Sequence, residues 1–277
     1  MSADQTPDAS MGQTVVFVHA HPDDEGTGTA GTMVRLAREG HRVVVVYATN
    51  GDFGAAPEDL APGETLVARR RSEAEASAAI TGLARVAWLD YADSGMTGWE
   101  QNSGERAFSR AEVDEAARRL ADVLDQEGAD VVVGYDWHGG YGHPDHVMVH
   151  TVSKRAIDMA ATQPRYLEVT MNRDKMRELF KAAQEMGMEG FDPDARGDDG
   201  LPIGTPEAEI HWAVDVTPDI AAKRAALACH GSQTDVQQIL SMPEDVFSIA
   251  FGTEHYVEPG RPEGMVTGWW MDPVPAG

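Results

Sequence analysis

Two short stretches of this sequence concentrate histidine and aspartate. Residues 19–25 read His-Ala-His-Pro-Asp-Asp-Glu, and residues 135–146 end in His-Pro-Asp-His. Two imidazoles and three carboxylates within seven residues cannot all be ionised and lie close together without compensation. A divalent metal ion is the simplest compensation, because carboxylates and neutral imidazoles are its natural ligands. Taken alone, the first stretch is equally well explained as a solvated acidic turn in which Asp23 or Asp24 caps a helix.

Each stretch follows an apolar run with the composition of a buried strand. Residues 14–18 read Thr-Val-Val-Phe-Val, and residues 130–134 read Asp-Val-Val-Val-Gly. Both runs have the length and the β-branched residues that are typical of strands. Polar side chains that follow such strands lie at the ligand-binding edge of an open α/β sheet. The two stretches are therefore expected to form two halves of one site, and their pairing favours the metal site over the solvated turn.

Composition limits the class of protein and its partners. A chain of 277 residues is long enough for one large α/β domain. The net charge of −24, from 22 basic and 46 acidic residues, argues against nucleic acid or an anionic membrane as a partner. The single cysteine, Cys229, excludes an intrachain disulfide and a multi-cysteine metal site.

Targeting signals are not evident in the sequence. No apolar run reaches the roughly 18–20 residues that span a bilayer. Residues 1–12 are polar and lack the apolar core of a signal peptide, so we expect a disordered lead-in. A cytoplasmic location is the default expectation.

Strand and helix patterns alternate along most of the chain, which predicts a Rossmann-like α/β fold. We expect a mostly parallel sheet with right-handed crossovers, helices on both faces and the first strand near the centre. The predicted strands are residues 14–18, 41–49, 85–91, 130–134, 166–171 and 210–216, and the predicted helices are residues 28–38, 64–81, 109–127, 147–161, 173–185 and 218–230.

Some local signals are more specific. Ser109 and Glu112 have the spacing of a capping box at the start of a helix, and Gly82 is expected to end the helix before it. Residues 187–205 are rich in Gly, Asp and Pro, which predicts a surface loop or lid. Without a repeat or a convincing linker, residues 13–277 are expected to form a single domain whose C-terminal part, about residues 165–277, shapes the substrate pocket.

The motifs His21-Pro22-Asp23-Asp24-Glu25 and His143-Pro144-Asp145-His146 resemble those of the LmbE-like (PIG-L) superfamily of zinc-dependent de-N-acetylases. Arg70, Glu73 and Gly82 match the helix signature of that family, and the loop at residues 93–96 is similar to that of the bacterial mycothiol-pathway sugar-conjugate deacetylases. The resemblance covers residues 14–160 well and is looser afterwards. It implies a hydrolase that removes an N-acetyl group from an amino sugar or a related small conjugate.

The resemblance also implies a metal site and a base. His21, Asp24 and His146 would be the zinc ligands, a set that leaves a coordination position open for water, as catalytic zinc requires. Zinc lowers the pKa of bound water and polarises an acyl oxygen. Asp23, which adjoins a ligand, would be the general base that removes the water proton.

Further roles follow from the same motifs. His143 would act as an acid or oxyanion stabiliser held by Asp145, and the hydroxyl of Tyr141 would donate to the tetrahedral oxyanion. Arg70 and Asp93 would contact a hydroxyl of the sugar or cyclitol. Ion-pair or capping roles explain Arg70 and Asp93 equally well, so both interpretations stay open.

The remaining histidines carry weaker signals. His19 lies two residues before His21, so it is on the same side of an extended chain but one pleat deeper, and we expect it to pack in the strand or support a ligand. His138 is either near the pocket mouth or an ordinary loop residue. No role is assigned to the histidines without a motif, which are His211, His230 and His255.

Three alternative functions agree less well with the sequence than a deacetylase does. Amidases of the family that cleave larger thiol conjugates tend to carry a lysine where this chain has Gly28, and a proline where it has Gly142. A nucleotide-binding protein would need Gly-x-Gly-x-x-Gly after the first strand, and His21 and Pro22 occupy that place. A member that binds zinc without turnover is disfavoured because every expected catalytic position is filled. The natural substrate, the choice between zinc and iron, and homo-oligomer formation stay open.

Overall fold

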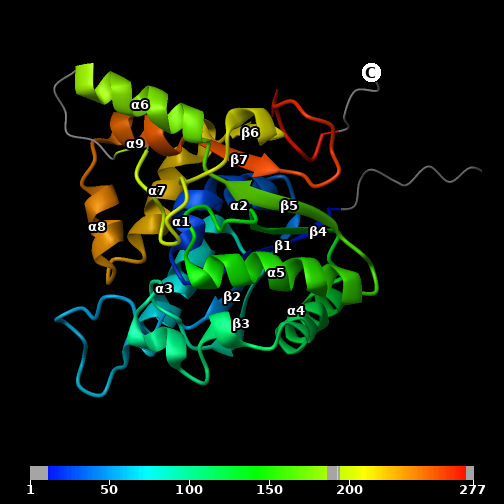
Figure 1. Ribbon diagram of the computed structural model, residues 1–277, viewed down its shortest axis with the longest axis vertical. Helices are drawn as coiled ribbons and strands as arrows, with labels where there is room; N and C mark the ends of the chain where they lie inside the picture. Colours follow the sequence, from blue (N-terminus) through cyan, green and yellow to red (C-terminus); the bar gives the residue numbers. More distant parts are fainter. Residues whose placement is uncertain (1–11, 186–191, 193, 273–277) are drawn as a thin grey trace, which may run out of the picture.

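The computed structural model describes residues 12–185, 192 and 194–272. Its centre is an eight-stranded sheet with the order β3-β2-β1-β4-β5-β7-β6-β8 (Figure 1). The strands are β1 Thr14–His19, β2 Arg42–Thr49, β3 Arg85–Tyr91, β4 Val131–Tyr135, β5 Arg165–Thr170, β6 Trp212–Asp215, β7 Thr253–Val257 and β8 Val266–Thr267. The first five strands are parallel with β1 in the middle, whereas β7 runs antiparallel to both β5 and β6.

Helices cover both faces of this sheet. α4 and α5 pack together on one face, and α1, α2 and α3 pack with α7 on the other (Figure 1). The helices are α1 Asp24–Gly28, α2 Ala30–Arg38, α3 Leu66–Thr81, α4 Val113–Glu127, α5 Pro144–Met159, α6 Arg173–Glu185, α7 Ile220–Ala228, α8 Thr234–Leu240 and α9 Glu244–Phe251. The predicted α/β class, with a mostly parallel sheet and helices on both faces, is therefore confirmed. Among the described residues, no helix is both long and apolar enough to cross a bilayer.

Continuous apolar runs bury the central strands. The side chains of residues 15–18 in β1 and 43–46 in β2 are at most 1% exposed. Such unbroken runs are typical of strands that are covered on both faces. Burying one valine side chain contributes roughly 1.5–3 kcal/mol, so these strands supply a large share of the core energy. The C-terminal ends of β1 and β4 are fixed by this packing, and both motif stretches begin there.

The start of α4 differs from the sequence prediction. Ser109 does not cap the helix; it lies in a short 3-10 turn, and α4 begins at Val113 without a side-chain cap. The backbone N–H of Ser109 donates instead to the Ser94 hydroxyl over 2.9 Å. Phe108 is fully buried and its N–H bonds to the Ala92 carbonyl. These tertiary contacts hold the segment and delay the helix, so the predicted capping box is wrong.

Other boundaries also move. α5 begins at Pro144, three residues before the predicted start, and this places Asp145 and His146 in its first turn. The helix predicted for residues 28–38 is divided at Thr29 into α1 and α2. The sequence does not predict four short elements, which are α8, α9, β7 and β8. They do not follow the strand–helix alternation of the rest of the chain. Residues 1–11 of the predicted lead-in, and residues 187–191 and 193 of the predicted loop, lie outside the described residues.

A buried ion pair connects two C-terminal elements, α7 and β7, to the start of α2. Lys223 of α7 and Glu254 of β7 are at most 1% exposed, and their charged atoms lie 2.7 Å apart. The Glu254 carboxylate also accepts hydrogen bonds of 2.9 Å from the backbone N–H groups of Gly31 and Thr32. These donors lie in the first turn of α2, where a carboxylate is favourable. Lys223 and Glu254 therefore fix the C-terminal elements on α2, next to the segment that carries the first motif.

Candidate metal centre

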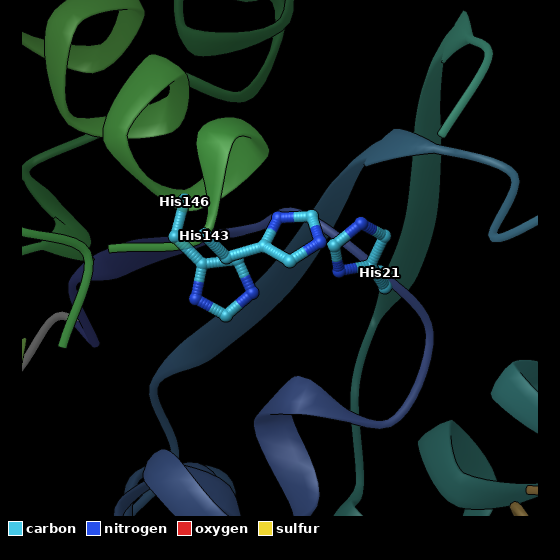
Figure 2. A group of neighbouring side chains, drawn as sticks. All are labelled: His21, His143 and His146. Atoms are coloured by element: carbon cyan, nitrogen blue, oxygen red, sulfur yellow. The ribbon is translucent and has the colours of Figure 1, made fainter. Parts of the chain in front are cut away.

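The two motif stretches meet at one edge of the sheet. β1 and β4 are adjacent and parallel, so the segments that follow them leave the sheet side by side. Chain winding reverses between these two strands, which is where open α/β sheets bind ligands. Figure 2 shows the rings of His143 and His146, from the start of α5, next to the ring of His21, which follows β1.

Three imidazoles and one carboxylate converge there. One ring nitrogen from each of His21, His143 and His146 lies within 4.8 Å of the others, and all three residues are buried. The two carboxylate oxygens of Asp24 face two of these rings: Oδ1 lies 3.4 Å from Nε2 of His146, and Oδ2 lies 3.4 Å from Nδ1 of His21. The residues predicted as ligands, His21, Asp24 and His146, are thus neighbours, and His143 joins them.

The environment of His146 fits a cation. Its Nδ1 lies 3.1 Å from the Gly139 carbonyl, which can only accept, so this nitrogen carries a proton. Its Nε2 is buried and has no hydrogen-bond partner among the residues that the structure describes. In the neutral ring Nε2 therefore turns a lone pair towards the Asp24 carboxylate, and two acceptors at this separation require a proton or a metal ion between them. A ligand imidazole whose other nitrogen donates to a carbonyl is a common metal-site arrangement.

Gly139 makes this arrangement possible. Its φ of +62° is unfavourable for other residues, and a Cβ at this position would lie 2.4 Å from the Cβ of His146. A side chain there would push the ligand ring away from its carbonyl partner.

His21 is held in the same way by carboxylates. Its Nε2 lies 3.1 Å from Oδ2 of Asp145 and 3.5 Å from Oδ1 of Asp93, and its Nδ1 faces Asp24. Burial alone would lower the pKa of His21, but the carboxylates of Asp93, Asp145 and Asp24 raise it well above its ordinary value. A carboxylate behind an imidazole fixes the ring and makes the opposite nitrogen a better metal ligand.

The contacts of Asp145 differ from those expected. Its carboxylate does not hydrogen-bond the His143 ring; it accepts from Nε2 of His21 and from the N–H and hydroxyl of Ser94, over 2.8 and 2.5 Å. Only the backbone N–H of Asp145 contacts His143, donating to Nδ1 over 3.1 Å. The reason is the early start of α5, which turns the Asp145 side chain towards the segment after β1.

His143 is a neutral hydrogen-bond donor in this site. Burial lowers its pKa to about 2, and the nearby rings of His21 and His146 act in the same direction. Because Nδ1 accepts from a backbone N–H, the proton of the neutral ring is on Nε2. Nε2 of His143 can therefore donate a hydrogen bond to a bound group.

Asp23 lies beside the centre in a strained conformation. Its φ is +124°, a region that non-glycine residues rarely adopt. Burial raises the pKa of Asp23 to about 6, although Arg70 opposes this shift. A carboxyl group with such a pKa can take up and release a proton near neutral pH.

Arg70 forms an ion pair, one of the two roles that the sequence leaves open. It is 3% exposed, and Nη2 lies 2.9 Å from Oδ2 of Asp23. It also donates to the carbonyls of Pro22 and Gly51. Asp93 is 6% exposed and accepts from the Gly95 N–H over 2.8 Å, in addition to its contact with His21.

Tyr141 lies over the histidines on a loop that Asp136 organises. The Asp136 carboxylate accepts from the N–H groups of His138 and Gly140, both over 2.9 Å. The ring of Tyr141 is perpendicular to that of His146, with centroids 4.9 Å apart. Burial and the nearby Asp24 raise the pKa of Tyr141, so its hydroxyl remains a donor.

Residues 196–205, called the strap here, hold this loop from outside. The Asp198 N–H donates to the Tyr141 carbonyl over 2.7 Å, and the Asp198 carboxylate accepts from the Thr97 N–H over 2.6 Å. Asp199 lies 2.9 Å from Nε2 of His138. The strap therefore connects the loop after β4 with the loop after β3, and His138 belongs to this connection.

Two further histidines have short buried contacts. His19 packs in the strand, where its ring nitrogens lie 3.0 Å from the Tyr135 hydroxyl and 2.8 Å from that of Thr29. His230, to which the sequence assigned no role, lies 2.6 Å from Glu25 under the first motif. No spacing pattern marks His230, because only the packing of α7 brings it to this place. The sequence also assigns no role to Ser94 and Asp136, although both lie in segments that follow predicted strands, after β3 and β4.

Comparison with known proteins extends this picture. Residues 16–157 match the PIG-L family, described as GlcNAc-PI de-N-acetylase. The chain is 33% identical over 262 residues to the 1D-myo-inositol 2-acetamido-2-deoxy-alpha-D-glucopyranoside deacetylase of Acidothermus cellulolyticus, covering 89% of each chain. It is 35% identical over 260 residues to the corresponding deacetylase 2 of Saccharopolyspora erythraea, covering 87% of this chain and 91% of the relative.

Solved structures share the fold at lower identity. N,N'-diacetylchitobiose deacetylase from Pyrococcus horikoshii is 24% identical with a TM-score of 0.53, covering 85% of this chain and 73% of that one. The A40926 pseudoaglycone deacetylase Dbv21 is 13% identical with a TM-score of 0.58, covering 88% and 96%. GalB, a 4-carboxy-2-hydroxymuconate hydratase from Pseudomonas putida KT2440, is 18% identical with a TM-score of 0.54, covering 90% and 97%. A hydratase on the same fold shows that the fold alone does not determine the reaction.

Proposed function

The chain belongs to the GlcNAc-PI de-N-acetylase (PIG-L) family, and from this premise we propose that it is a metal-dependent N-deacetylase of an amino-sugar–cyclitol conjugate. The first substrate to test is 1D-myo-inositol 2-acetamido-2-deoxy-alpha-D-glucopyranoside, the compound named in its relatives. The observation that carries the proposal is the buried Nε2 of His146, which has no hydrogen-bond partner within residues 12–185, 192 and 194–272 and faces the Asp24 carboxylate, because this pair requires a cation between its atoms.

His21, Asp24 and His146 would hold the ion. A divalent ion at this position supplies Lewis acidity, which makes water more acidic and an acyl oxygen more electrophilic. The nitrogen and oxygen donors suit zinc, and ferrous iron is the alternative for which the same donors are suitable. Asp145 and Gly139 would keep the two ligand rings in place from behind, through the contacts described above.

Asp23 transfers the proton and His143 donates a hydrogen bond in this proposal. Asp23 accepts the proton of the attacking water, which its raised pKa allows near neutral pH. As the C–N bond breaks, Asp23 returns this proton to the amide nitrogen, while the neutral His143 ring keeps its proton and donates a hydrogen bond from Nε2 to the oxyanion. Tyr141 remains protonated and donates its hydroxyl to the oxyanion of the tetrahedral intermediate. Water adds to the acetyl carbon, and the products are acetate and the free amine.

A hydroxyl group of the substrate would donate a hydrogen bond to Asp93. Its carboxylate adjoins His21 and lies on the loop after β3, at the edge of the centre. Arg70 is committed to Asp23 and two backbone carbonyls, so in this proposal it supports the base and does not bind the sugar directly.

The test is an assay of acetate and free amine released from the GlcNAc–inositol compound by the purified protein. We expect turnover that a chelator abolishes and that added zinc or ferrous iron restores, and no turnover by Asp24→Asn. A cysteine-containing conjugate assayed in parallel distinguishes the amidase alternative, which predicts cleavage of that conjugate and little acetate from the GlcNAc–inositol compound. Absence of hydrolysis of either compound with either metal would refute the proposal.

A further inference from the structure

A buried polar cluster lies directly beneath Asp23. Its centre is Glu25, which is 0% exposed. One carboxylate oxygen, Oε1, lies 2.6 Å from Nε2 of His230 and accepts from the Ser77 hydroxyl over 2.8 Å. The other, Oε2, accepts from the backbone N–H of Asp23 over 3.1 Å. Three segments distant in sequence, the first motif, α3 and the end of α7, therefore meet at one carboxylate.

His230 and Glu25 form an ion pair away from solvent. Both side chains are 0% exposed, and Nε2 of His230 lies 2.6 Å from Oε1 of Glu25. Burial would lower the pKa of His230, and Glu25 raises it above its ordinary value. Nδ1 of His230 is buried, and no atom in the described part of the chain forms a hydrogen bond with it. A buried unsatisfied nitrogen is unfavourable, so good packing alone does not account for a histidine at this position.

The strained backbone of Asp23 indicates what the Glu25–His230 pair does. A residue in a sparsely populated backbone region keeps its conformation only when its surroundings determine it. Two residues do so here. Glu25 holds the N–H of Asp23 from below, and Arg70 holds its carboxylate and the preceding carbonyl of Pro22 from the side. Without the lower contact, the turn at residues 21–25 is free to relax, and the Asp23 carboxylate then moves relative to Asp24 and His146.

We infer that Glu25 and His230 are positioning residues for the base: His230 fixes Glu25, and Glu25 holds Asp23 in the strained conformation in which its carboxylate pairs with Arg70. The inference rests on the proposed function in so far as Asp23 is the base. It assigns a role in the reaction to His230, a residue of the C-terminal part that lies outside the family match at residues 16–157.

Kinetics of three His230 variants test this inference. His230→Ala and His230→Phe remove the donor to Glu25, and the phenylalanine keeps most of the ring volume in case the alanine variant does not fold. We expect kcat to fall about tenfold or more in both variants, because a small misplacement of a catalytic group is costly. KM and metal content should stay near their wild-type values. His230→Gln, whose amide can donate to Glu25, should recover much of kcat.

Lys223→Met is the matched control. Lys223 belongs to the same helix, is equally buried and is also paired with a glutamate, but its partner Glu254 holds α2 and does not contact Asp23. This variant should melt at a lower temperature and keep its kcat at temperatures where it is folded. Equal losses of kcat in Lys223→Met and His230→Ala would overturn the inference, as would wild-type kcat in folded His230→Ala and His230→Phe.

A crystal structure of the His230 variant that folds, beside wild type, provides a readout that does not depend on activity. We expect Asp23 to leave its positive-φ conformation or to shift its carboxylate away from Asp24. An unchanged turn at residues 21–25 would overturn the inference even if the substrate is never found. An inactive wild type whose turn relaxes in the variant would instead refute only the proposed function.

Discussion

The two halves of the molecule contribute to the site in different ways. Residues 14–160 form the regular strand–helix part, and all the groups proposed to react or to bind metal come from it, at the ends of β1 and β4. The part from residue 165 onwards adds antiparallel strands, the strap and α7. It contributes supports: the strap behind Tyr141, His230 beneath Asp23, and the Lys223–Glu254 pair on α2.

This difference explains why recognisable sequence motifs occur in residues 14–160 and not in the part from residue 165 onwards. A reacting group must lie at a fixed distance from the others, so its type and spacing are constrained by the strand that presents it. A support needs only one contact, which any side chain of suitable reach and polarity can make. Variants of the reacting groups should therefore abolish the reaction, whereas variants of the supports should weaken it in graded steps.

The largest effect is expected for Asp23→Asn. Asparagine cannot accept the water proton, so kcat should fall by about 10² to 10⁴, the usual contribution of a general base. The amide has nearly the same shape as the carboxyl group, so KM and metal content should change little. Steady-state kinetics with elemental analysis checks this. Retention of more than a tenth of wild-type kcat would assign the base to another residue.

Tyr141→Phe should have the next largest effect. Loss of one donor to the oxyanion is expected to reduce kcat by on the order of 10². The ring still packs against His146, so the melting temperature should be nearly unchanged. A variant that loses substrate affinity but keeps kcat would show that the hydroxyl binds the ground state.

Asp199→Ala tests a support and should have a smaller effect. It removes the partner of His138 and one of the strap's connections to the Tyr141 loop. We expect kcat to fall about three- to tenfold, because Tyr141 becomes less well positioned. Asp199→Asn, which can still accept from His138, should lie closer to wild type. In the double variant with Tyr141→Phe, the loss due to Asp199→Ala should disappear; full additivity would contradict the positioning role.

Glu168→Gln tests a residue of β5 that lies outside the site, and it should leave kcat unchanged. Burial raises the pKa of Glu168 from 4.5 to about 7 in the folded protein, although Lys154 opposes the shift. The folded state therefore binds this proton more tightly than the unfolded chain does. The stabilisation is complete below the unfolded pKa and is lost as the pH rises through about 7.

Melting curves of wild type and Glu168→Gln check this prediction. The variant should melt at a higher temperature than wild type at about pH 8, and the difference should shrink at about pH 5. A difference that does not depend on pH would show that Glu168 is already ionised at the lower pH, for instance through its contact with His150 at 3.5 Å.

Much of the N-terminal half could be predicted from the sequence. The valine runs of β1 and β2, and Gly82 at the end of α3, follow directly from burial and backbone preference. The convergence of His21 and His146 follows from two adjacent parallel strands. The capping box at Ser109 failed because tertiary contacts with Ser94 and Ala92 outweighed a local preference.

The rest depends on contacts that have no local signature. The carboxylate of Asp145 turns to His21 because α5 starts at Pro144, a boundary that sequence patterns define only loosely. His230 reaches Glu25 only because α7 packs on α1 and α3. Such long-range packing is encoded in the whole chain, so neither residue pairing could be inferred from spacing.

The most direct test of a metal centre built from both motifs is the metal content of purified protein, wild type beside His146→Ala, by elemental analysis. We expect about one zinc or iron per chain in wild type and a large loss in the variant, because three protein ligands define a catalytic site. His150→Ala, one helical turn further along α5, should keep its metal. Equal metal content in wild type and His146→Ala, or no metal in either after anaerobic reconstitution, would contradict this assignment.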